Sequence, residues 1–422
     1  MCSPGPPEVR RRGGSGERQM ADDDVRGRSG EPAVTSGDPP VIRSDVPGSF
    51  PWSVLHDRHP ALIRKVGDAT PYGPDRRRAL DLLLREITDG VIGPLERAAH
   101  DRELWESWDR GHVGRRWDDA PFLWAESYFY RKLLAAVGYF DPGPWRGVDP
   151  FEPFKQAELL GKGVEAELRA LDGVPGMPPG EQAQTLLQRA LWGNQADLGF
   201  RLSAGGAQAG GRTTGLTADD SDLLWPAVDG PRPARICFVA DNAAGELLPD
   251  LALIDHLLHA RGAREVLLHV KPTPYYVSDA VPADVIACVR RLSAAGGRAG
   301  EVGERLWGAM GSGRLAVRAH VFSCAPLPYS EMPEDLREEF ASASLTIMKG
   351  DLNYRRLVGD RMWPPTTPFA SAVGYFPGPV AALRTLKSDV VMGLGADVVT
   401  ELDAGGRPWR TSGTHALIQV RP

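Results

Sequence analysis

Cysteine is scarce in this chain of 422 residues, which holds four: Cys2, Cys237, Cys288 and Cys324. No two of them form a CxxC pair, so we do not expect a thiolate zinc site. This pattern is typical of a reducing compartment, and we expect a cytoplasmic protein. No apolar run reaches the ~18 residues of a membrane span, and the N-terminus lacks the apolar core of a signal peptide. The sequence therefore predicts no membrane partner.

An excess of basic residues is also missing. Lys and Arg number 49 against 55 Asp and Glu, which gives a net charge of −6. This balance argues against nucleic acid as a partner, because a nucleic-acid-binding domain usually presents a basic face. It leaves room for a local basic pocket that binds a phosphorylated small molecule. The apolar share of 42% is ordinary and allows a sizeable core.

Several common catalytic motifs are absent. The first strand of the C-terminal half is followed by Asp-Asn-Ala-Ala-Gly-Glu rather than GxGxxG, so the glycine loop of a dinucleotide site or of an ordinary Rossmann methyltransferase is missing. The chain also has no GxxxxGK[ST], no GxSxG and no HExxH. The chemistry must therefore come from residues that no single short motif collects.

The first half of the chain reads as a tail followed by helices. Residues 1–45 are polar and small, and we expect a disordered tail. Residues 46–225 are predicted to be a mostly helical region. Its candidate helices, indicated by apolar spacing or by an initial proline, cover 77–92, 122–139 and 181–198. The Gly-rich and Ala-rich segment 203–215 is expected to be a flexible loop.

Residues 226–422 alternate between strand and helix patterns. Predicted strands cover 236–240, 265–270, 315–322, 345–348 and 389–393, and predicted helices cover 245–261, 282–296 and 333–341. Strands separated by helices predict an α/β fold in which a mainly parallel sheet carries helices on both faces. We expect this part to be the catalytic domain.

Polar residues follow three of these predicted strands. Asp241 and Asn242 follow the first, Asp279 ends the loop after the second, and the segment from Lys349 to Arg355 follows the strand at 345–348. Parallel strands point their carboxyl ends at one edge, so these residues should meet there. Asp241, Asn242 and Asp279 would make an all-oxygen site for magnesium or manganese. Alone, Asp241 could equally cap the following helix.

The segment that begins at Lys349 combines residues that suit a phosphate-binding loop. Lys349 supplies a mobile positive charge for a phosphate, Gly350 lets the backbone approach a ligand, and Asp351 could hold metal-bound water or act as an acid or base. The alternative is a charged loop with an internal ion pair. Arg384 and Lys387, by spacing alone, are typical of the solvated face of a helix.

Seven segments together resemble the metal-dependent damage-control phosphatase family, first catalogued as a domain of unknown function. The resemblance is to its third subfamily, which includes the acidic-residue methyltransferase-like proteins and carries an RTxK motif. The segments run in family order and are Trp124-Ala-Glu-Ser-Tyr-Phe-Tyr-Arg-Lys132, Asp149-Pro-Phe-Glu-Pro-Phe-Lys155, Leu191-Trp-Gly-Asn-Gln-Ala-Asp-Leu198, Asp241-Asn-Ala-Ala-Gly-Glu246, Lys271-Pro-Thr-Pro-Tyr-Tyr-Val-Ser-Asp279, Lys349-Gly-Asp-Leu-Asn-Tyr-Arg-Arg-Leu-Val-Gly-Asp360 and Arg384-Thr-Leu-Lys387.

The resemblance implies a helical N-terminal region packed on an α/β/α sandwich. It implies a divalent metal (Mn, Co, Ni or Mg) held by Asp241, Asn242 and Asp279, and phosphatase activity on small phosphometabolites such as fructose 1-phosphate and fructose 6-phosphate. The residues that it implies for the substrate site are Glu246, Asp351, Asn353, Tyr354, Arg355 and Lys387. The chain departs from the family pattern at Ala244-Gly245 and in the 203–215 loop, which leaves the substrate open.

The sequence thus predicts a metal-dependent phosphomonoesterase. Lys349, Arg355 and Lys387 would neutralise the phosphate oxygens, and Asn353 and Tyr354 could hydrogen-bond the sugar. Asp351 would orient the attacking water or protonate the leaving alkoxide. A covalent aspartyl-phosphate at Asp241 is an alternative to metal-activated water. A carboxyl methyltransferase that uses S-adenosylmethionine on proteins, and a repurposed non-hydrolytic member, are the alternative functions. The oligomeric state stays open.

Overall fold

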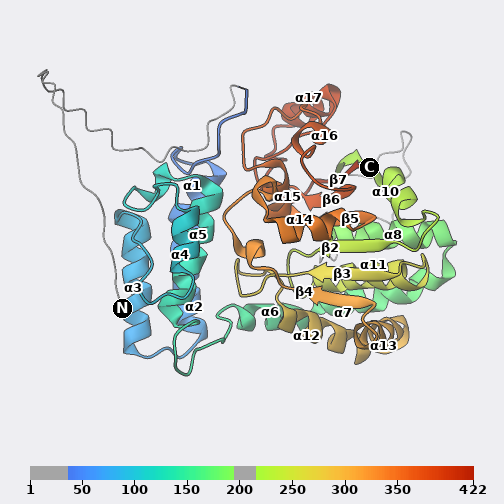
Figure 1. Ribbon diagram of the computed structural model, residues 1–422, viewed down its shortest axis with the longest axis horizontal. Helices are drawn as coiled ribbons and strands as arrows, with labels where there is room; N and C mark the ends of the chain where they lie inside the picture. The colour runs from blue at the N-terminus through green and yellow to red at the C-terminus, as the bar shows by residue number, and fades with distance from the viewer. Residues whose placement is uncertain (1–36, 194–214) are drawn as a thin grey trace, which may run out of the picture.

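A seven-stranded sheet lies at the centre of the C-terminal half of the protein (Figure 1). The structure is a computed structural model, which describes residues 37–193 and 215–422. The strand order is β1-β7-β6-β5-β2-β3-β4, and neighbouring strands are parallel except β6 and β7. The predicted α/β class with a mainly parallel sheet is confirmed. The strands are β1 (Leu216–Asp219), β2 (Arg235–Val239), β3 (Glu265–His269), β4 (Leu315–Arg318), β5 (Leu345–Lys349), β6 (Val380–Thr385) and β7 (Ala416–Arg421).

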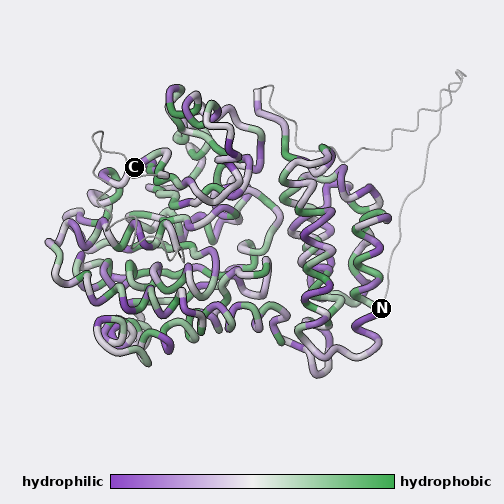
Figure 2. The backbone as a smooth tube through the Cα atoms, turned by 180° about the vertical axis from the view of Figure 1, so that it is seen from behind, coloured by the Kyte–Doolittle hydropathy of each residue, from purple (hydrophilic) through white to green (hydrophobic). Residues whose placement is uncertain are grey.

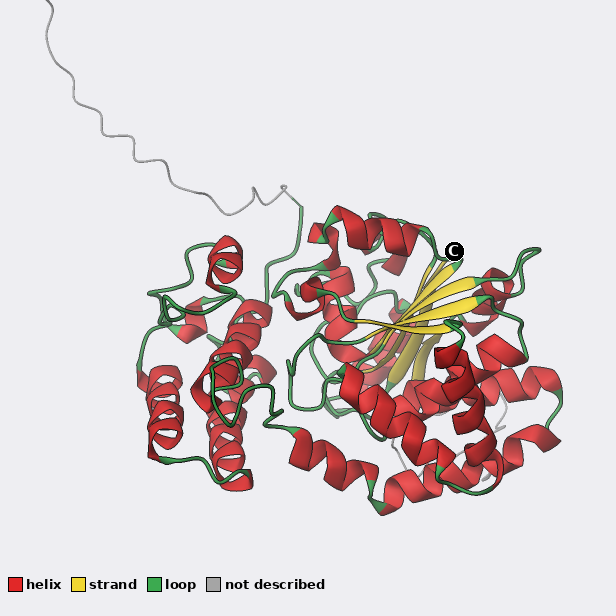
Figure 3. Ribbon diagram, turned by 60° about the horizontal axis from the view of Figure 1, so that its bottom comes forward, coloured by secondary structure: helices red, strands yellow, loops and turns green. Residues whose placement is uncertain are grey.

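Helices cover both faces of the sheet, as Figure 3 shows with the strands in yellow between red helices. Alternate residues of β2 face opposite layers: Ile236 and Phe238 pack in one core, and Cys237 and Val239 in the other. The first core is closed by α8 (Pro179–Trp192), α11 (Leu247–His259), α12 (Pro282–Ser293) and α13 (Gly297–Gly311). The second is closed mainly by α14 (Glu334–Ala341), α15 (Gly350–Val358) and α16 (Phe369–Ala372).

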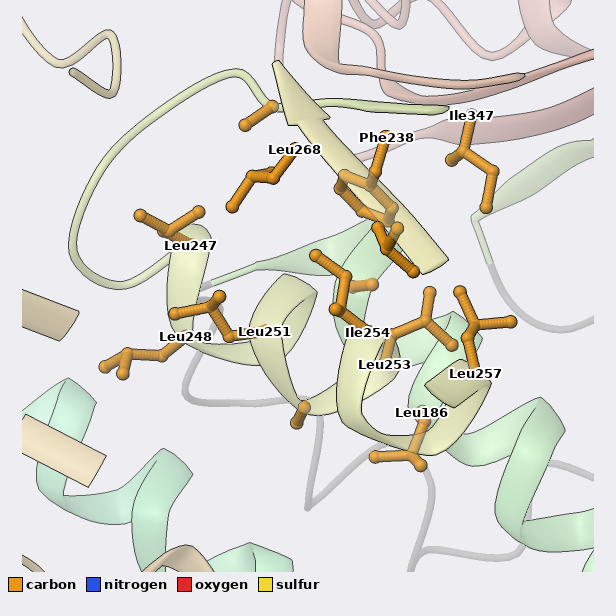
Figure 4. Packing of buried hydrophobic residues seen from close by; sticks show 14 of the residues in the cluster. Leu186, Phe238, Leu247, Leu248, Leu251, Leu253, Ile254, Leu257, Leu268 and Ile347 are labelled. Carbon is orange, nitrogen blue, oxygen red and sulfur yellow. The ribbon is translucent and has the colours of Figure 1, made fainter. Parts of the chain in front are cut away.

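Helix α11 supplies much of the first core because it is apolar on nearly every side. Its residues from Leu247 to Leu258 are all buried. Figure 4 shows Leu251, Ile254 and Leu257 of this helix beneath Phe238. Burial of apolar side chains between two layers is the main stabilising contribution to such a sandwich. The start of α11 is thereby fixed beside the end of β2, where Asp241 lies.

The N-terminal helices form a second body beside the sandwich, at the left of Figure 1. Its main helices are α2 (His59–Ala69), α3 (Pro74–Asp89), α4 (Arg102–Trp108) and α5 (Phe122–Val137), which share a core of their own. Figure 2 shows hydrophobic and hydrophilic residues alternating along these helices, as amphipathic helices require. The other α-helices are α1 (Phe50–Ser53), α6 (Glu152–Leu159), α7 (Lys162–Ala170), α10 (Ser221–Val228) and α17 (Ala396–Ala404).

The predicted helices at 77–92 and 122–139 correspond to α3 and α5. Helix α8 ends at Trp192, and residues 194–198 of the predicted helix lie outside the described residues, as do residues 203–214 of the predicted loop. Residues 1–36 of the predicted tail also lie outside them.

The end of that tail is packed against the fold: Ile42 is buried, its amide donates to the Asp360 carbonyl, and its carbonyl accepts from the Phe122 amide. Strand β1 joins the sheet although it precedes residue 226.

Two predictions for the C-terminal part are wrong. Residues 389–393 form no strand; they are a buried loop whose carbonyls at Val390 and Met392 accept hydrogen bonds from the side chains of Arg384 and Gln419. Arg384 lies on strand β6 rather than on a solvated helix face, and its side chain is fully buried. The predicted strand at 315–322 ends at Arg318 and is followed by a 3₁₀ turn, Val321–Cys324. None of the described helices combines the length and apolarity that crossing a bilayer requires.

Candidate functional site

The carboxyl ends of β2 and β3 bring the three predicted metal ligands together. Asn242 and Asp279 pair as an isolated antiparallel bridge. The Ala280 amide donates to the Asp241 carbonyl at 2.9 Å, and the Ala243 amide donates to the Ser278 carbonyl at 2.7 Å. The loop after β3 therefore folds back along the residues that follow β2. The prediction that strand ends would gather these residues at one edge agrees with this geometry.

The side chains of this group are buried and partly held by hydrogen bonds. Asp241 and Asp279 are 6% and 2% exposed. The Ser278 hydroxyl donates to Asn242 Oδ1 at 2.7 Å, and the Tyr276 amide donates to Asp279 Oδ2 at 3.3 Å. Asn242 is thus oriented with its amide nitrogen toward Asp241, at 3.4 Å from Oδ2. Two buried carboxylates and the Asn242 side chain thus come together where water is largely excluded.

Burial acts on both carboxyl groups, and repulsion from neighbouring carboxylates is added at Asp241. Burial raises the pKa of Asp241 well above its ordinary value, and the neighbouring carboxylates of Glu246 and Asp279 raise it further. Burial also raises the pKa of Asp279, and the Lys271 ammonium offsets this only in part. A pair of buried carboxyl groups that repel each other is stabilised when a cation lies between them.

Gly350 borders the Asp241 carboxylate. Its φ of +85° lies in the left-handed region that favours glycine, and a Cβ atom at this position would overlap Asp241 Oδ2. The turn from β5 into α15 therefore passes directly against the proposed ligand. The sequence suggests that Gly350 lets the backbone come close to a ligand; in the structure, it comes close to the carboxylate itself.

The donor set fits a hard divalent cation. In residues 37–193 and 215–422, no three His, Cys, Asp or Glu side chains cluster as a metal-binding group. The predicted set contains two such side chains, Asp241 and Asp279, with the Asn242 amide as the third donor. Carboxylate and amide oxygens suit Mg²⁺ or Mn²⁺, which keep water molecules in their remaining positions. The pairing of the segments that carry the buried residues Asp241 and Asp279 is the structural observation that favours a cation here.

Asp351 lies in the first turn of α15 and is held by residues at the end of β6 and just after it. Arg384 Nε donates to Asp351 Oδ1 at 2.8 Å, the Ser388 hydroxyl donates to the same oxygen at 3.0 Å, and the Lys387 amide at 3.3 Å. Burial would raise the pKa of Asp351, but the guanidinium groups of Arg384 and Arg355 outweigh it and hold this pKa below its ordinary value. Asp351 is therefore ionised at neutral pH.

Glu246 and Lys387 form an ion pair at the same edge. Lys387 Nζ lies 3.1 Å from Glu246 Oε1. Burial opposes ionisation of Glu246, but the ammonium groups of Lys387 and Lys349 lower its pKa below the ordinary value. The side chain of Lys387 is 45% exposed, so its ammonium reaches solvent. Gly193 packs against Glu246, because a Cβ atom there would lie 2.7 Å from Glu246 Cγ.

Lys349 is placed differently from a mobile surface charge. It is 2% exposed, its ammonium lies 3.2 Å from Asp250 Oδ1, and it donates to the Ala190 carbonyl of α8. Burial raises the pKa of Asp250 to about 7 even beside this ammonium. Lys349 therefore connects β5 to α8 and α11, with its charge directed into the protein.

Asn353, Tyr354 and Arg355 on α15 are also engaged by protein groups. Asn353 Nδ2 donates to the carbonyls of Ala240 and Lys349, at 3.0 and 2.8 Å. The Tyr354 hydroxyl donates to Gln419 Oε1 at 2.9 Å. Arg355 forms a two-pronged ion pair with Asp360, at 2.7 and 2.9 Å, and Nη1 donates to Glu126 Oε2 at 3.0 Å. These three residues are buried, and their contacts fix the geometry of α15.

Two residues of the site are not predicted from the sequence to be functional. Arg384 holds Asp351, and only its place in the RTxK segment could point to it. Glu126 on α5 contacts both Arg355 and the Tyr276 hydroxyl, each at 3.0 Å, and thereby joins the helical body to the site edge. Its segment, Trp124 to Lys132, carries the family resemblance, but apolar periodicity places Glu126 off the core face of its helix.

Known proteins resemble this chain over most of its length. A family model described as the damage-control phosphatase ARMT1-like domain matches residues 54–402. The chain is 29% identical over 433 residues to damage-control phosphatase ARMT1 of Mus musculus, covering 90% of this chain and 98% of that protein. It is 29% identical over 434 residues to the protein of the same name from Danio rerio, covering 90% and 96%. A solved DUF89 family protein from Pyrococcus horikoshii is 18% identical, with a TM-score of 0.43 and coverage of 82% of this chain and 94% of that one.

Proposed function

Because the chain belongs to the damage-control phosphatase ARMT1-like family, we propose that it is a divalent-metal-dependent phosphatase of small phosphorylated metabolites. Sugar phosphates of the fructose 1-phosphate and fructose 6-phosphate type are the substrate class that we propose. The observation that carries the proposal is the convergence of Asp241, Asn242 and Asp279 at the carboxyl end of β2 and β3. The RTxK residues Arg384 and Lys387 lie at the same edge.

Asp241, Asn242 and Asp279 would hold the metal, which is Mn, Co, Ni or Mg in this proposal. When bound, it would supply a Lewis acid that stabilises the charge developing on the phosphoryl oxygens. The Tyr276 amide already orients Asp279. Ser278 holds Asn242 Oδ1 while the Asn242 amide nitrogen faces Asp241, so Asn242 would turn its side-chain amide to present the oxygen to the metal. Gly350 leaves the space that the Asp241 carboxylate occupies.

Lys387 is the lysine of the predicted set that is suited to contact the phosphate. Its ammonium is solvent-accessible and is balanced by Glu246, so an incoming phosphate can share it. Lys349 and Arg355, in contrast, are committed to buried carboxylates, and we propose that they act by holding β5 and α15 in place. Asn353 and Tyr354 support α15 in the same way.

For Asp351 we propose the role of orienting the attacking water. The contacts from Arg384, Ser388 and the Lys387 amide all reach Oδ1, and no described residue donates a hydrogen bond to Oδ2. An ionised carboxylate whose pKa is lowered is a poor proton donor and a suitable acceptor for water. This favours water activation over protonation of the leaving alkoxide.

The test is phosphate release from a panel of sugar and nucleotide monophosphates, each assayed with Mn, Co, Ni and Mg and with a chelator. We expect metal-dependent release that is strongest for ketohexose phosphates. Titration calorimetry with S-adenosylmethionine, run in parallel, probes the methyltransferase alternative. Binding of that cofactor without phosphate release from any ester would contradict the proposal, and absence of both would point to a repurposed, non-hydrolytic protein.

A further inference from the structure

Lys271 lies at the edge of the site, and the proposed metal and phosphate contacts assign it no role. It is the second residue after β3, and its amide donates to the Ala280 carbonyl at 2.9 Å. The Ala280 amide in turn donates to the Asp241 carbonyl at 2.9 Å. The backbone of Lys271 is thus linked through one residue to Asp241, and Ala280 is the chain neighbour of Asp279. Lys271 belongs structurally to the proposed metal site.

The side chain of Lys271 is buried, and its ammonium has no ion-pair partner in the described part of the chain. The residue is 2% exposed, and the contact that its ammonium makes is with the Tyr275 ring, whose centroid lies 5.5 Å away. Other buried lysines are neutralised at close range: Lys349 by Asp250 at 3.2 Å, and Lys155 by Asp149 and Asp284 at 2.9 and 2.8 Å. Burying an unpaired ammonium is costly, so its retention calls for a ligand.

The field of Lys271 acts on the proposed metal ligands. Its ammonium lowers the pKa of Asp279, against the larger opposing effect of burial, and it also lowers the pKa of Asp241. A divalent cation between these two carboxylates would balance their charges. The charge of Lys271 would then be left without a counter-charge in the same small volume, which is the condition that attracts an anion.

We propose that the Lys271 ammonium binds a non-bridging oxygen of the phosphoryl group. This inference rests on the proposed function and extends it by naming a phosphate-binding residue on the loop after β3. Lysine suits this role because its compact charge can follow an oxygen as the phosphoryl group changes geometry. In the absence of the anion, a weak cation–π interaction with the neighbouring Tyr275 ring stabilises the ammonium.

The test compares Lys271→Met with wild type and with Lys65→Met, an exposed lysine on α2. The full chain is loaded with Mn²⁺, and binding of inorganic phosphate is measured by calorimetry alongside the kinetics of sugar-phosphate hydrolysis. We expect Lys271→Met to weaken phosphate binding at least 10-fold and to lower kcat/KM by about 100-fold, the scale for loss of one preorganised electrostatic contact. Lys65→Met should match wild type.

Thermal unfolding separates a ligand-binding role from a structural one. Replacing an unpaired buried ammonium by an apolar side chain should leave the unfolding midpoint unchanged or raise it, and should not weaken Mn²⁺ binding. A midpoint that falls together with Mn²⁺ affinity would overturn the proposal in favour of a structural role. Lys271→Gln provides a second uncharged variant if Lys271→Met does not fold, and it should show the same loss of phosphate affinity.

The outcomes also distinguish this inference from the proposed function. If wild type hydrolyses sugar phosphates and both uncharged variants keep wild-type phosphate affinity and kcat/KM, the role of Lys271 is overturned while the phosphatase function stands. If wild type hydrolyses no ester but binds phosphate in a Lys271-dependent way, the anion site stands and the proposed function fails. Equal phosphate affinity in wild type and variants, without turnover, would overturn both.

Discussion

At the scale of single residues, Gly350 is the position on which the geometry of the proposed metal site depends most directly. Its backbone is left-handed, with φ of +85°, and any Cβ atom added to it would overlap Asp241 Oδ2. We expect Gly350→Ala to displace the Asp241 carboxylate, to weaken divalent-metal binding at least 10-fold, and to destabilise the fold by at least the ~1–2 kcal/mol of a left-handed non-glycine residue. Metal titration and urea unfolding measure the two effects.

Gly262→Ala is the matched control for this prediction. Gly262 has φ of +69°, and no atom lies within 4 Å of the position that its Cβ would take. This variant therefore has the backbone strain without the overlap, and should lose stability but keep metal affinity. Wild-type metal binding in Gly350→Ala would show that Asp241 is not held where the structure has it.

Lysine residues show what sequence reasoning can and cannot reach at this scale. Strand-end position correctly brings Lys349 to the edge of the sheet where Glu246 and Lys387 also lie. Sequence cannot reveal that Lys349 is paired with Asp250, which is on a different element, whereas Lys271 has no such partner among the described residues. Pairing is a property of tertiary contacts between distant segments, so spacing along the chain does not encode it.

At the scale of elements, Glu126 joins helix α5 to helix α15 and to the loop after β3. Its Oε2 accepts from Arg355 Nη1 and from the Tyr276 hydroxyl, each at 3.0 Å, in a buried setting. Burial raises the pKa of Glu126 against the opposing effect of Arg355. We expect Glu126→Ala to destabilise the protein by about 2–4 kcal/mol, because it leaves a buried guanidinium with one carboxylate fewer and a partly buried hydroxyl without its acceptor.

A double-mutant cycle with Tyr276→Phe checks that the effect comes from this bridge. The two single changes share one hydrogen bond, so their effects on the free energy of unfolding should be less than additive by about 1 kcal/mol. Strictly additive effects would mean that Glu126 and Tyr276 stabilise the protein independently, and that α5 is not tied to the site loop through them.

The strands also show where local sequence is sufficient to predict secondary structure. Strands β2, β3 and β5 are predicted within one residue at each end, because short apolar runs between turn signals are distinctive. Strand β6 is not predicted, since its Arg384 interrupts the apolar pattern. The buried guanidinium is satisfied by Asp351, Ser388 and the Val390 carbonyl. The apolar run at 389–393 resembles a strand, but its backbone is satisfied by side chains from β6 and β7, which a local pattern cannot show.

At the scale of the whole molecule, a buried histidine in the helical body makes the stability of the protein sensitive to acid. His59 is buried in the helical core, stacked on Phe129 with ring centroids 3.7 Å apart, and neither ring nitrogen has a hydrogen-bond partner in the described residues. Burial, aided by the Arg58 charge, lowers the pKa of His59 from 6.5 to about 3. As the pH falls through 6.5, His59 is therefore protonated in the unfolded chain but stays neutral in the folded protein.

The depressed pKa fixes the sign of the effect. The contribution of neutral His59 to stability is fully present above pH 6.5 and is lost as the pH falls toward 3, by about 1.4 kcal/mol for each pH unit. His59→Phe should remove this loss, so that its advantage over wild type grows by about 2–3 kcal/mol between pH 6.5 and pH 4.5. Urea unfolding at both pH values measures it, with the exposed His100→Phe as control. An advantage independent of pH would contradict a neutral, buried His59.

Asp279→Ala tests whether Asp241, Asn242 and Asp279 form a metal site on which phosphate release depends. Metal content and phosphate release should be measured on the same preparation, beside wild type and the exposed control Asp81→Ala. We expect Asp279→Ala to lose bound metal and to release phosphate at least about 100-fold more slowly, while Asp81→Ala behaves as wild type. A folded Asp279→Ala protein with full metal content and the wild-type rate of phosphate release would contradict the account.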